Sequence, residues 1–211
     1  ALTACDPAGP GAPPSPSASE TGTATPTPTP TPTPVAAPTL GEMMLTADGM
    51  GTLVFGEPPS ADPVLQMVAE DPAACSEFAP AGTPEATRWR PIAAYDVGGY
   101  PTFGVAVTDG NLERIDLYDS TIPADGGIRI GDTLDAVTAA HPDASIVHSG
   151  LTDIHVVTGV RGTLQIEVAR ADSTGYWPAS DIGHVMYIHA AVTGYGTFTV
   201  AASENIAGGC L

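Results

Sequence analysis

The sequence contains no lysine, and all six of its basic residues are arginine. A chain without lysine has no phosphate-loop lysine, no Schiff-base amine and no Ser-x-x-Lys acylating site, so these three chemistries are excluded. The sequence also lacks an apolar run of the roughly 18 residues that a membrane-spanning helix requires. We therefore expect any attachment to a membrane to be covalent.

Positive charge is scarce throughout the chain. The 24 acidic residues outnumber the basic ones so strongly that the formal net charge is -18 at pH 7. A field of this sign repels the phosphates of nucleic acids and of anionic lipids. We therefore expect neither nucleic acid nor an anionic lipid surface as a partner.

Large apolar side chains are nearly absent from residues 1–38, where Pro, Thr, Ala, Ser and Gly dominate. Such a segment buries too little apolar surface to offset the entropy of ordering, which predicts a disordered stalk. Its alternating Thr-Pro stretch favours extended polyproline II and would hold a domain away from a bilayer, although a plain spacer is the alternative. Residues 39–211 remain as one domain, long enough to bury its own core.

The first of three cysteines lies at the start of this stalk. Leu2-Thr3-Ala4-Cys5 resembles the lipobox of bacterial lipoproteins. The resemblance implies that Cys5 carries a diacylglyceryl group and that the protein is extracytoplasmic, lipid-anchored to the bacterial cell membrane. The alternative is an unpaired cysteine in a disordered tail, where an exposed thiol would be reactive.

The other two cysteines are Cys75 and Cys210. In an oxidising extracytoplasmic compartment the simplest arrangement pairs them in a disulfide. Such a bridge would stabilise the domain by about 4 to 5 kcal/mol on the chain-entropy model. Two buried free thiols are the alternative.

Two stretches of the domain look alike. Residues 51–56 and 127–131 each read as a short apolar strand with a closing glycine, followed by a helix start at Ser60 and Thr133 respectively. Both residues are good N-caps, an aspartate follows each in the first turn, and a proline ends each pattern. The pattern predicts one helix in each half.

Strand patterns follow each predicted helix. In the first half, the turn Thr108-Asp-Gly-Asn111 between alternating apolar runs predicts a hairpin, with Ile115 and Leu117 facing the core. We expect the remaining strands near residues 92–97, 154–158, 163–170, 184–192 and 197–202. The prediction is an α+β fold of two helix-plus-antiparallel-sheet repeats, about residues 40–122 and 126–211.

This organisation resembles the tandem-repeat fold of the β-lactamase inhibitory protein family and, one repeat at a time, the small lipoproteins of the outer-membrane assembly machinery. The Phe55-Gly56 and Ile130-Gly131 junctions before a capped helix carry the resemblance, which covers roughly residues 40–200. It implies a non-enzymatic protein that binds other proteins with the exposed face of its sheet.

Motifs for metal binding and catalysis are missing. The chain has no His-Glu-x-x-His and no cysteine pair at metal spacing, and His184 and His189 would point to opposite faces of a strand. The acidic run from Asp109 to Asp119 fits a solvated hairpin better than a calcium loop. With no Gly-x-Ser-x-Gly either, we expect no metal, no cofactor and no catalytic residue.

Four residues are candidates for binding a partner: Tyr100, Asp109, Tyr176 and Trp177. The three aromatics fall in predicted loops, where exposed rings make good anchors, although packing over a sheet edge is the alternative. Local turn geometry alone explains an aspartate at position 109. The leading hypothesis is an adaptor or inhibitor that binds an envelope protein. The others are a receptor for a small or cell-wall ligand and, third, an envelope hydrolase.

Overall fold

The structure is a computed structural model that describes residues 36–210 apart from 172–174, 202 and 204. The chain divides into two units, Ala1–Pro34 and Val35–Leu211, and all the described residues belong to the second. Cys5 and nearly all of the predicted stalk therefore lie outside the described residues. No helix in the described part of the chain is long and apolar enough to cross a membrane.

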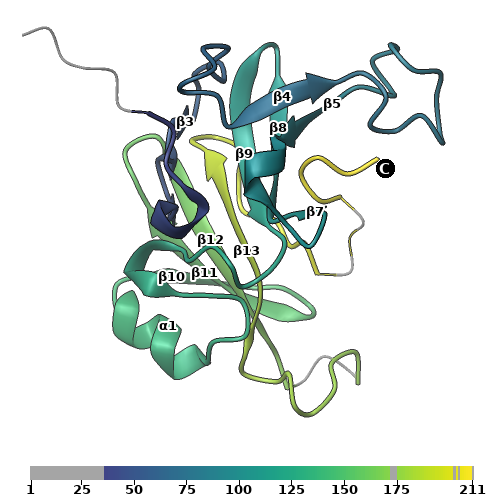
Figure 1. The fold of residues 1–211 in the computed structure, drawn as a ribbon. Helices are drawn as coiled ribbons and strands as arrows, with labels where there is room; N and C mark the ends of the chain where they lie inside the picture. Colours follow the sequence, from purple (N-terminus) through teal and green to yellow (C-terminus); the bar gives the residue numbers. More distant parts are fainter. Residues whose placement is uncertain (1–35, 172–174, 202, 204, 211) are drawn as a thin grey trace, which may run out of the picture. The chain divides into compact units, whose positions relative to one another are not determined.

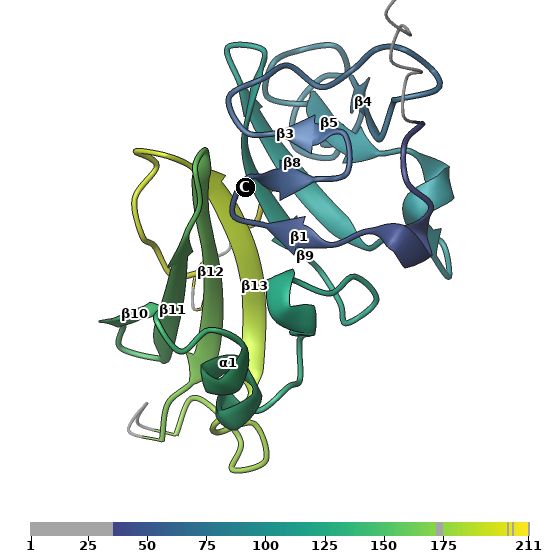
Figure 2. The same cartoon turned by 90° about the vertical axis from the view of Figure 1, so that its left-hand side faces the viewer.

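A six-stranded antiparallel sheet in the order β10-β11-β12-β13-β9-β8 forms the centre of the domain (Figures 1 and 2). Its strands are β8 (Phe103–Thr108), β9 (Asn111–Leu117), β10 (Ser145–His148), β11 (Thr152–Thr158), β12 (Gly162–Ala169) and β13 (Val185–Val192). The pairing of β9 with β13 joins the two halves of the chain in one sheet.

Shorter elements surround this sheet. Three small antiparallel sheets contain β1 (Leu45–Thr46), β2 (Gly49–Met50) and β3 (Leu53–Val54), then β4 (Val68–Asp71) and β5 (Arg88–Pro91), then β6 (Asp96–Val97) and β7 (Tyr100–Pro101). The helices are the single-turn η1 (Leu40–Glu42), η2 (Ala93–Tyr95) and η3 (Asp125–Gly127), and α1 (Leu134–Ala140).

The predicted α+β class is therefore wrong. The chain is 9% helical and 36% strand, and its two halves share a sheet instead of forming two helix-plus-sheet repeats. The second predicted helix is confirmed as α1, where the Thr133 hydroxyl accepts a hydrogen bond from the N–H of Ala136. The helix predicted after Ser60 does not form. There, Asp62 closes a turn by accepting from Val64, and the chain enters β4 instead.

Some of the strand predictions are confirmed and others are wrong. The hairpin across Asp109 is confirmed as β8–β9, and the segments near 154–158, 163–170 and 184–192 are β11, β12 and β13. Residues 92–97 instead contain η2 and the short β6, and residues 127–131 contain no strand. The described residues of 197–202 are also outside any strand. The predicted disulfide is present, joining Cys75 to Cys210 with their Cα atoms 5.3 Å apart.

Alternation along the strands separates an apolar face of the sheet from a polar one. On β12, Leu164, Ile166 and Val168 enter the main hydrophobic core, together with Val137 of α1. Gln165 and Glu167 lie on the opposite face because successive side chains of a strand point to opposite sides. The C-terminal segment, defined as residues 193–210 and coloured yellow in Figure 1, covers this polar face through the contacts described below.

Candidate functional site

The polar face carries most of the buried charge of the domain. Strand register aligns Gln165 with His189 and His189 with Asp116, so side chains from β12, β13 and β9 share one face. Arg114, Asp116, Gln165, Glu167 and His189 are all between 0% and 3% exposed. Burying so many polar groups is unfavourable unless each finds a partner, so the site depends on what covers it.

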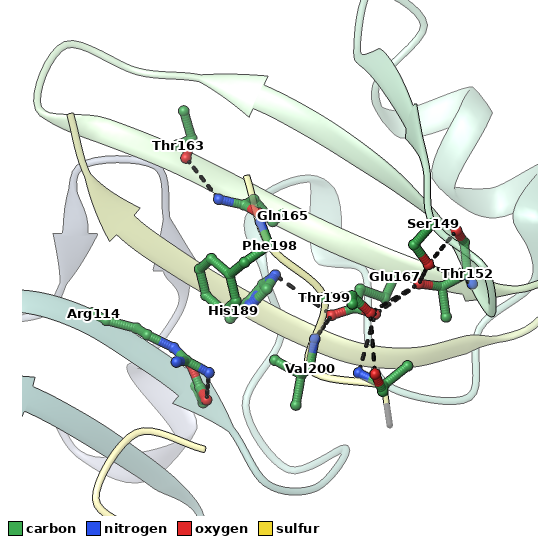
Figure 3. A network of polar contacts seen from close by, with 12 residues as sticks. Arg114, Ser149, Thr152, Thr163, Gln165, Glu167, His189, Phe198, Thr199 and Val200 are labelled. Carbon is green, nitrogen blue, oxygen red and sulfur yellow. Dashed lines mark hydrogen bonds and ion pairs between the residues drawn. The ribbon is translucent and has the colours of Figure 1, made fainter. Parts of the chain in front are cut away.

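Glu167 is the centre of this network (Figure 3). Its carboxylate accepts hydrogen bonds from the hydroxyls of Thr152 at 2.7 Å and Thr199 at 2.8 Å, and from the N–H of Val200 at 2.5 Å. Thr152 belongs to β11, whereas the other two donors belong to the C-terminal segment. These donors replace the water that an ionised carboxylate loses on burial.

Arg114 and Asp116 form a buried ion pair on β9. The guanidinium Nε and Nη2 lie 2.6 Å and 2.5 Å from the two carboxylate oxygens, which is the bidentate geometry that favours arginine over lysine. The ring of Phe198 stacks on the same guanidinium, with Cζ 4.2 Å from the ring centroid. The charge of this arginine is therefore neutralised and shielded from solvent.

His189 differs from its neighbours in having no hydrogen bond. Neither ring nitrogen has a partner within the described part of the chain, and the nearest carboxylate oxygen, Oε1 of Glu167, lies 3.8 Å from Nε2. Burial, reinforced by the nearby charge of Arg114, lowers the pKa of His189 to about 3. The imidazole is consequently neutral at pH 7 and packs edge-on against Phe198.

The network does not present a catalytic arrangement. Among the described residues, the histidine ring nitrogens that form hydrogen bonds contact Asp125 and Asp153, and no serine, threonine or cysteine side chain. A nucleophile needs a base within hydrogen-bond reach, and a substrate needs access that the buried Glu167 and His189 do not offer. Nothing in the described residues gives positive evidence of catalysis. That the protein is not an enzyme stays a prediction.

Metal binding has equally little support. No group of three or more His, Cys, Asp or Glu side chains in the described ranges is arranged to hold a metal ion.

A separate cavity lies where β9 ends beside β13. The two strands pair only between Ile188–Ala191 and Arg114–Leu117, so Val185–Tyr187 of β13 continue past the end of β9. The space between them has a volume of about 250 Å³. Its lining is mostly apolar and includes two residues of the C-terminal segment, the full set being Asp116, Leu117, Tyr118, Ile130, Met186, Tyr187, Ile188, Val200 and Ile206.

Polar groups at this cavity are few. Asp116 is occupied by Arg114, and the hydroxyl of Tyr118 donates to the backbone oxygen of Ala207. The hydroxyl of Tyr187 has no hydrogen bond to any other described residue. Burial raises the pKa of Tyr187, so this hydroxyl stays protonated at neutral pH and is a donor available to a ligand.

The predicted aromatic pair lies beside the cavity through Tyr187. Trp177 contacts Tyr176 edge-on at a centroid distance of 4.7 Å and Tyr187 at 6.5 Å. Its indole N–H donates to the backbone oxygen of Leu151, so this ring packs on the sheet, whereas Tyr176 is 48% exposed. Of this pair, only Tyr176 keeps the accessibility of a binding anchor.

The structure does not bring the four candidate binding residues together. Tyr100 is 77% exposed in the β6–β7 hairpin, which precedes β8, and Asp109 lies in the turn after β8. Asp109 has a φ of 50°, so the local turn alone explains it. No contact among the described residues joins either one to Tyr176 and Trp177.

Sequence reasoning missed Glu167, His189 and Tyr187. In the run Leu164-Gln-Ile-Glu-Val168, alternating polar residues are typical of a half-exposed strand, so Glu167 reads as a solvated position. The only signal was the segment after β13, which has too few charges for a freely solvated tail. That signal does not say which face the segment covers.

Comparisons with known proteins add little. No protein family model matches the chain, and no curated protein sequence matches it. Among solved structures, the chain is similar to the uncharacterized protein YfeY from Escherichia coli, with 18% sequence identity and a TM-score of 0.40. That match covers 69% of this chain and 97% of the other. A likeness this distant carries no argument about fold or function.

Proposed function

We propose that this chain is a non-enzymatic lipoprotein of the bacterial envelope whose domain binds a small apolar ligand in the cavity between β9 and β13. The observation that carries the proposal is the end of β9 beside the longer β13, where a cavity of about 250 Å³ has a mostly apolar lining. An apolar pocket with a few directed polar groups is the usual form of a small-molecule site.

The lining defines the ligand class. No unpaired charge faces the cavity, because the carboxylate of Asp116 is bound by Arg114, and this favours an uncharged molecule. The hydroxyl of Tyr187, which has no hydrogen bond to another described residue, suits a single hydrogen-bond acceptor on the ligand. A cavity of about 150 Å³ already holds benzene in other proteins, so a monocyclic ring or a short branched acyl group fits here.

The binding of a protein partner is the second candidate, favoured by β10. This strand is at the edge of the sheet and pairs only with β11 among the described elements. Its side chains Ile146 and Val147 are 51% and 42% exposed, and an edge of this kind accepts an added strand. The polar face of the sheet is covered by the C-terminal segment, so the open sheet face implied by the inhibitor-family resemblance is missing on that side.

The anchor is the third part of the proposal. The lipobox resemblance of Leu2–Cys5 supports lipidation, and the disulfide between Cys75 and Cys210 supports an oxidising compartment. Cys5 itself lies outside the described residues.

A filled-cavity variant tests the ligand proposal. Ile206→Trp places an indole at the cavity, and Val160→Trp adds the same group at a position that is 91% exposed. Benzene should raise the melting temperature of the wild-type protein and of Val160→Trp, and it should not raise that of Ile206→Trp. An equal rise in all three proteins, or none in the wild type, would contradict the proposal.

A further inference from the structure

The sheet holds the C-terminal segment by side chains that bind its backbone. Gln165 accepts from the N–H of Phe198 at 3.3 Å and donates to the carbonyl of Gly196 at 3.1 Å. Two strand positions further on, Glu167 accepts from the N–H of Val200. The described part of the segment forms no ladder with the sheet, and these contacts take the place of one.

The same mode of contact continues further along the segment. Arg114 donates to the carbonyl of Asn205 at 2.9 Å, and Asp116 accepts from the N–H of Ala207 at 2.9 Å. Tyr118 donates to the carbonyl of Ala207. Bonds to backbone groups do not depend on the side chains of the bound segment, so another peptide that follows the same backbone path could make them equally well.

Side-chain contacts with this face come from Thr199, whose hydroxyl donates to Glu167, and from Phe198. The ring of Phe198 contacts both the guanidinium of Arg114, whose Cζ is 4.2 Å from the ring centroid, and the imidazole of His189, at a centroid distance of 4.3 Å. An aromatic side chain is therefore preferred at this position.

The chain's own segment is an imperfect occupant of this face. Both ring nitrogens of His189 are buried without a hydrogen bond to any described residue, although the ring is only 1% exposed. An unsatisfied buried polar atom is costly, and phenylalanine offers it no oxygen. An aromatic residue with a hydroxyl would keep the contact with Arg114 and supply the missing partner.

We propose that the polar face of the sheet is a groove for an extended peptide of a partner protein, which the C-terminal segment occupies as an internal competitor. The partner peptide takes the place of Gly196–Val200 and presents a tyrosine where Phe198 lies. The disulfide between Cys75 and Cys210 holds the C-terminal segment near the groove, at an effective concentration in the millimolar range. Because Val200 and Ile206 of this segment line the apolar cavity, displacement of the segment would also open that cavity.

A labelled peptide tests the groove in trans. The probe is a fluorescein-labelled peptide of residues 194–207, made as the native sequence, as its Phe198→Tyr form and in a scrambled order. Fluorescence anisotropy compares the oxidised protein with the double variant Cys75→Ser, Cys210→Ser. We expect the double variant to bind the native peptide at least tenfold more tightly than the oxidised protein does, because its competitor is less restrained.

The tyrosine peptide should bind the double variant about fivefold more tightly than the native peptide, as one added hydrogen bond predicts. That gain should disappear when His189→Leu is added. Absence of binding at about 1 mM, the effective concentration of a tethered segment, or equal binding of the scrambled peptide would overturn the proposal.

Hydrogen exchange on the oxidised wild-type protein gives a test that needs no variant. A removable segment opens without global unfolding, so the amides of Val200 and Ala207 should exchange at least about tenfold faster than the buried amides of β12. Exchange of both sets at one common rate, governed by global unfolding, would show that the segment is an integral part of the fold and overturn the proposal.

Discussion

Oε1 of Glu167 lies 3.8 Å from Nε2 of His189, and neither side chain has more than 1% of its surface exposed. The distance is too long for a hydrogen bond, so a carboxylate and a neutral imidazole are buried side by side without neutralising each other. The donors that satisfy the carboxylate come largely from the C-terminal segment, which links the stability of this pair to that segment.

Acid should destabilise the domain through His189. Its pKa is lowered to about 3 in the folded state, whereas an unfolded histidine titrates near 6.5, so between these values the unfolded state binds more protons. The free energy of unfolding should therefore fall as the pH drops from about 6.5 toward 3, by about 2 to 3 kcal/mol over the first two units.

Urea denaturation at pH 7 and pH 4.5 measures this fall. His189→Met should flatten most of this pH dependence, because it removes the buried imidazole. Burial also lowers the pKa of His155, so a smaller dependence of the same sign should persist in His189→Met. An identical pH profile in wild type and His189→Met would contradict the burial of an uncharged imidazole.

Removing the carboxylate of Glu167 should strongly destabilise the domain. Glu167→Ala leaves the N–H of Val200 and two threonine hydroxyls without their acceptor, which should cost about 3 to 5 kcal/mol of the free energy of unfolding. Glu167→Gln keeps one acceptor oxygen and should cost less. Glu77→Gln at an exposed position is the matched control, and its effect should lie within about 0.5 kcal/mol of zero.

Loss of the disulfide should destabilise the domain. Cys75 and Cys210 close a loop with a sequence separation of 135, for which chain entropy predicts about 5 kcal/mol. The double variant Cys75→Ser, Cys210→Ser should therefore unfold at a much lower urea concentration than the oxidised protein. A midpoint unchanged within error would show that the bridge does not constrain the unfolded chain.

Lipidation of Cys5 can be measured directly. Protein extracted from membranes of its native host should have an intact mass above that of the polypeptide by at least a diacylglyceryl group, and the Cys5→Ser variant should appear in the soluble fraction. An unmodified Cys5 in membrane-extracted protein would remove the argument for a lipid anchor.

Local signals in the sequence predicted those elements that depend on neighbouring residues. Thr133 caps α1 through its own hydroxyl, and the Asp109-Gly110 turn forms the β8–β9 hairpin with positive φ angles. The same reasoning failed after Ser60, where the carboxylate of Asp62 accepts a hydrogen bond from the N–H of Val64 in a turn and no helix begins. Pairing of β4 with β5 stabilises this segment instead.

The candidate site was hidden because it depends on long-range contacts. Glu167 becomes a buried residue only when the C-terminal segment, more than thirty positions along the chain, lies over it. The cavity likewise results from where β9 ends relative to β13, which is a property of the sheet register and not of either strand alone. The one long-range signal in the sequence was the pair of cysteines in the domain. Their predicted disulfide placed the C-terminus against Cys75.

Methyl-resolved NMR during a benzene titration measures whether an apolar ligand enters the cavity between β9 and β13. Saturable shifts should be confined to the methyl groups of Leu117, Ile130, Met186, Val200 and Ile206, which line the cavity. They should leave the methyl groups of Val160 and Ile146 unchanged, because these exposed positions are not among its lining residues. Absence of saturable shifts, or equal shifts across the hydrophobic core, would contradict a binding site at this position.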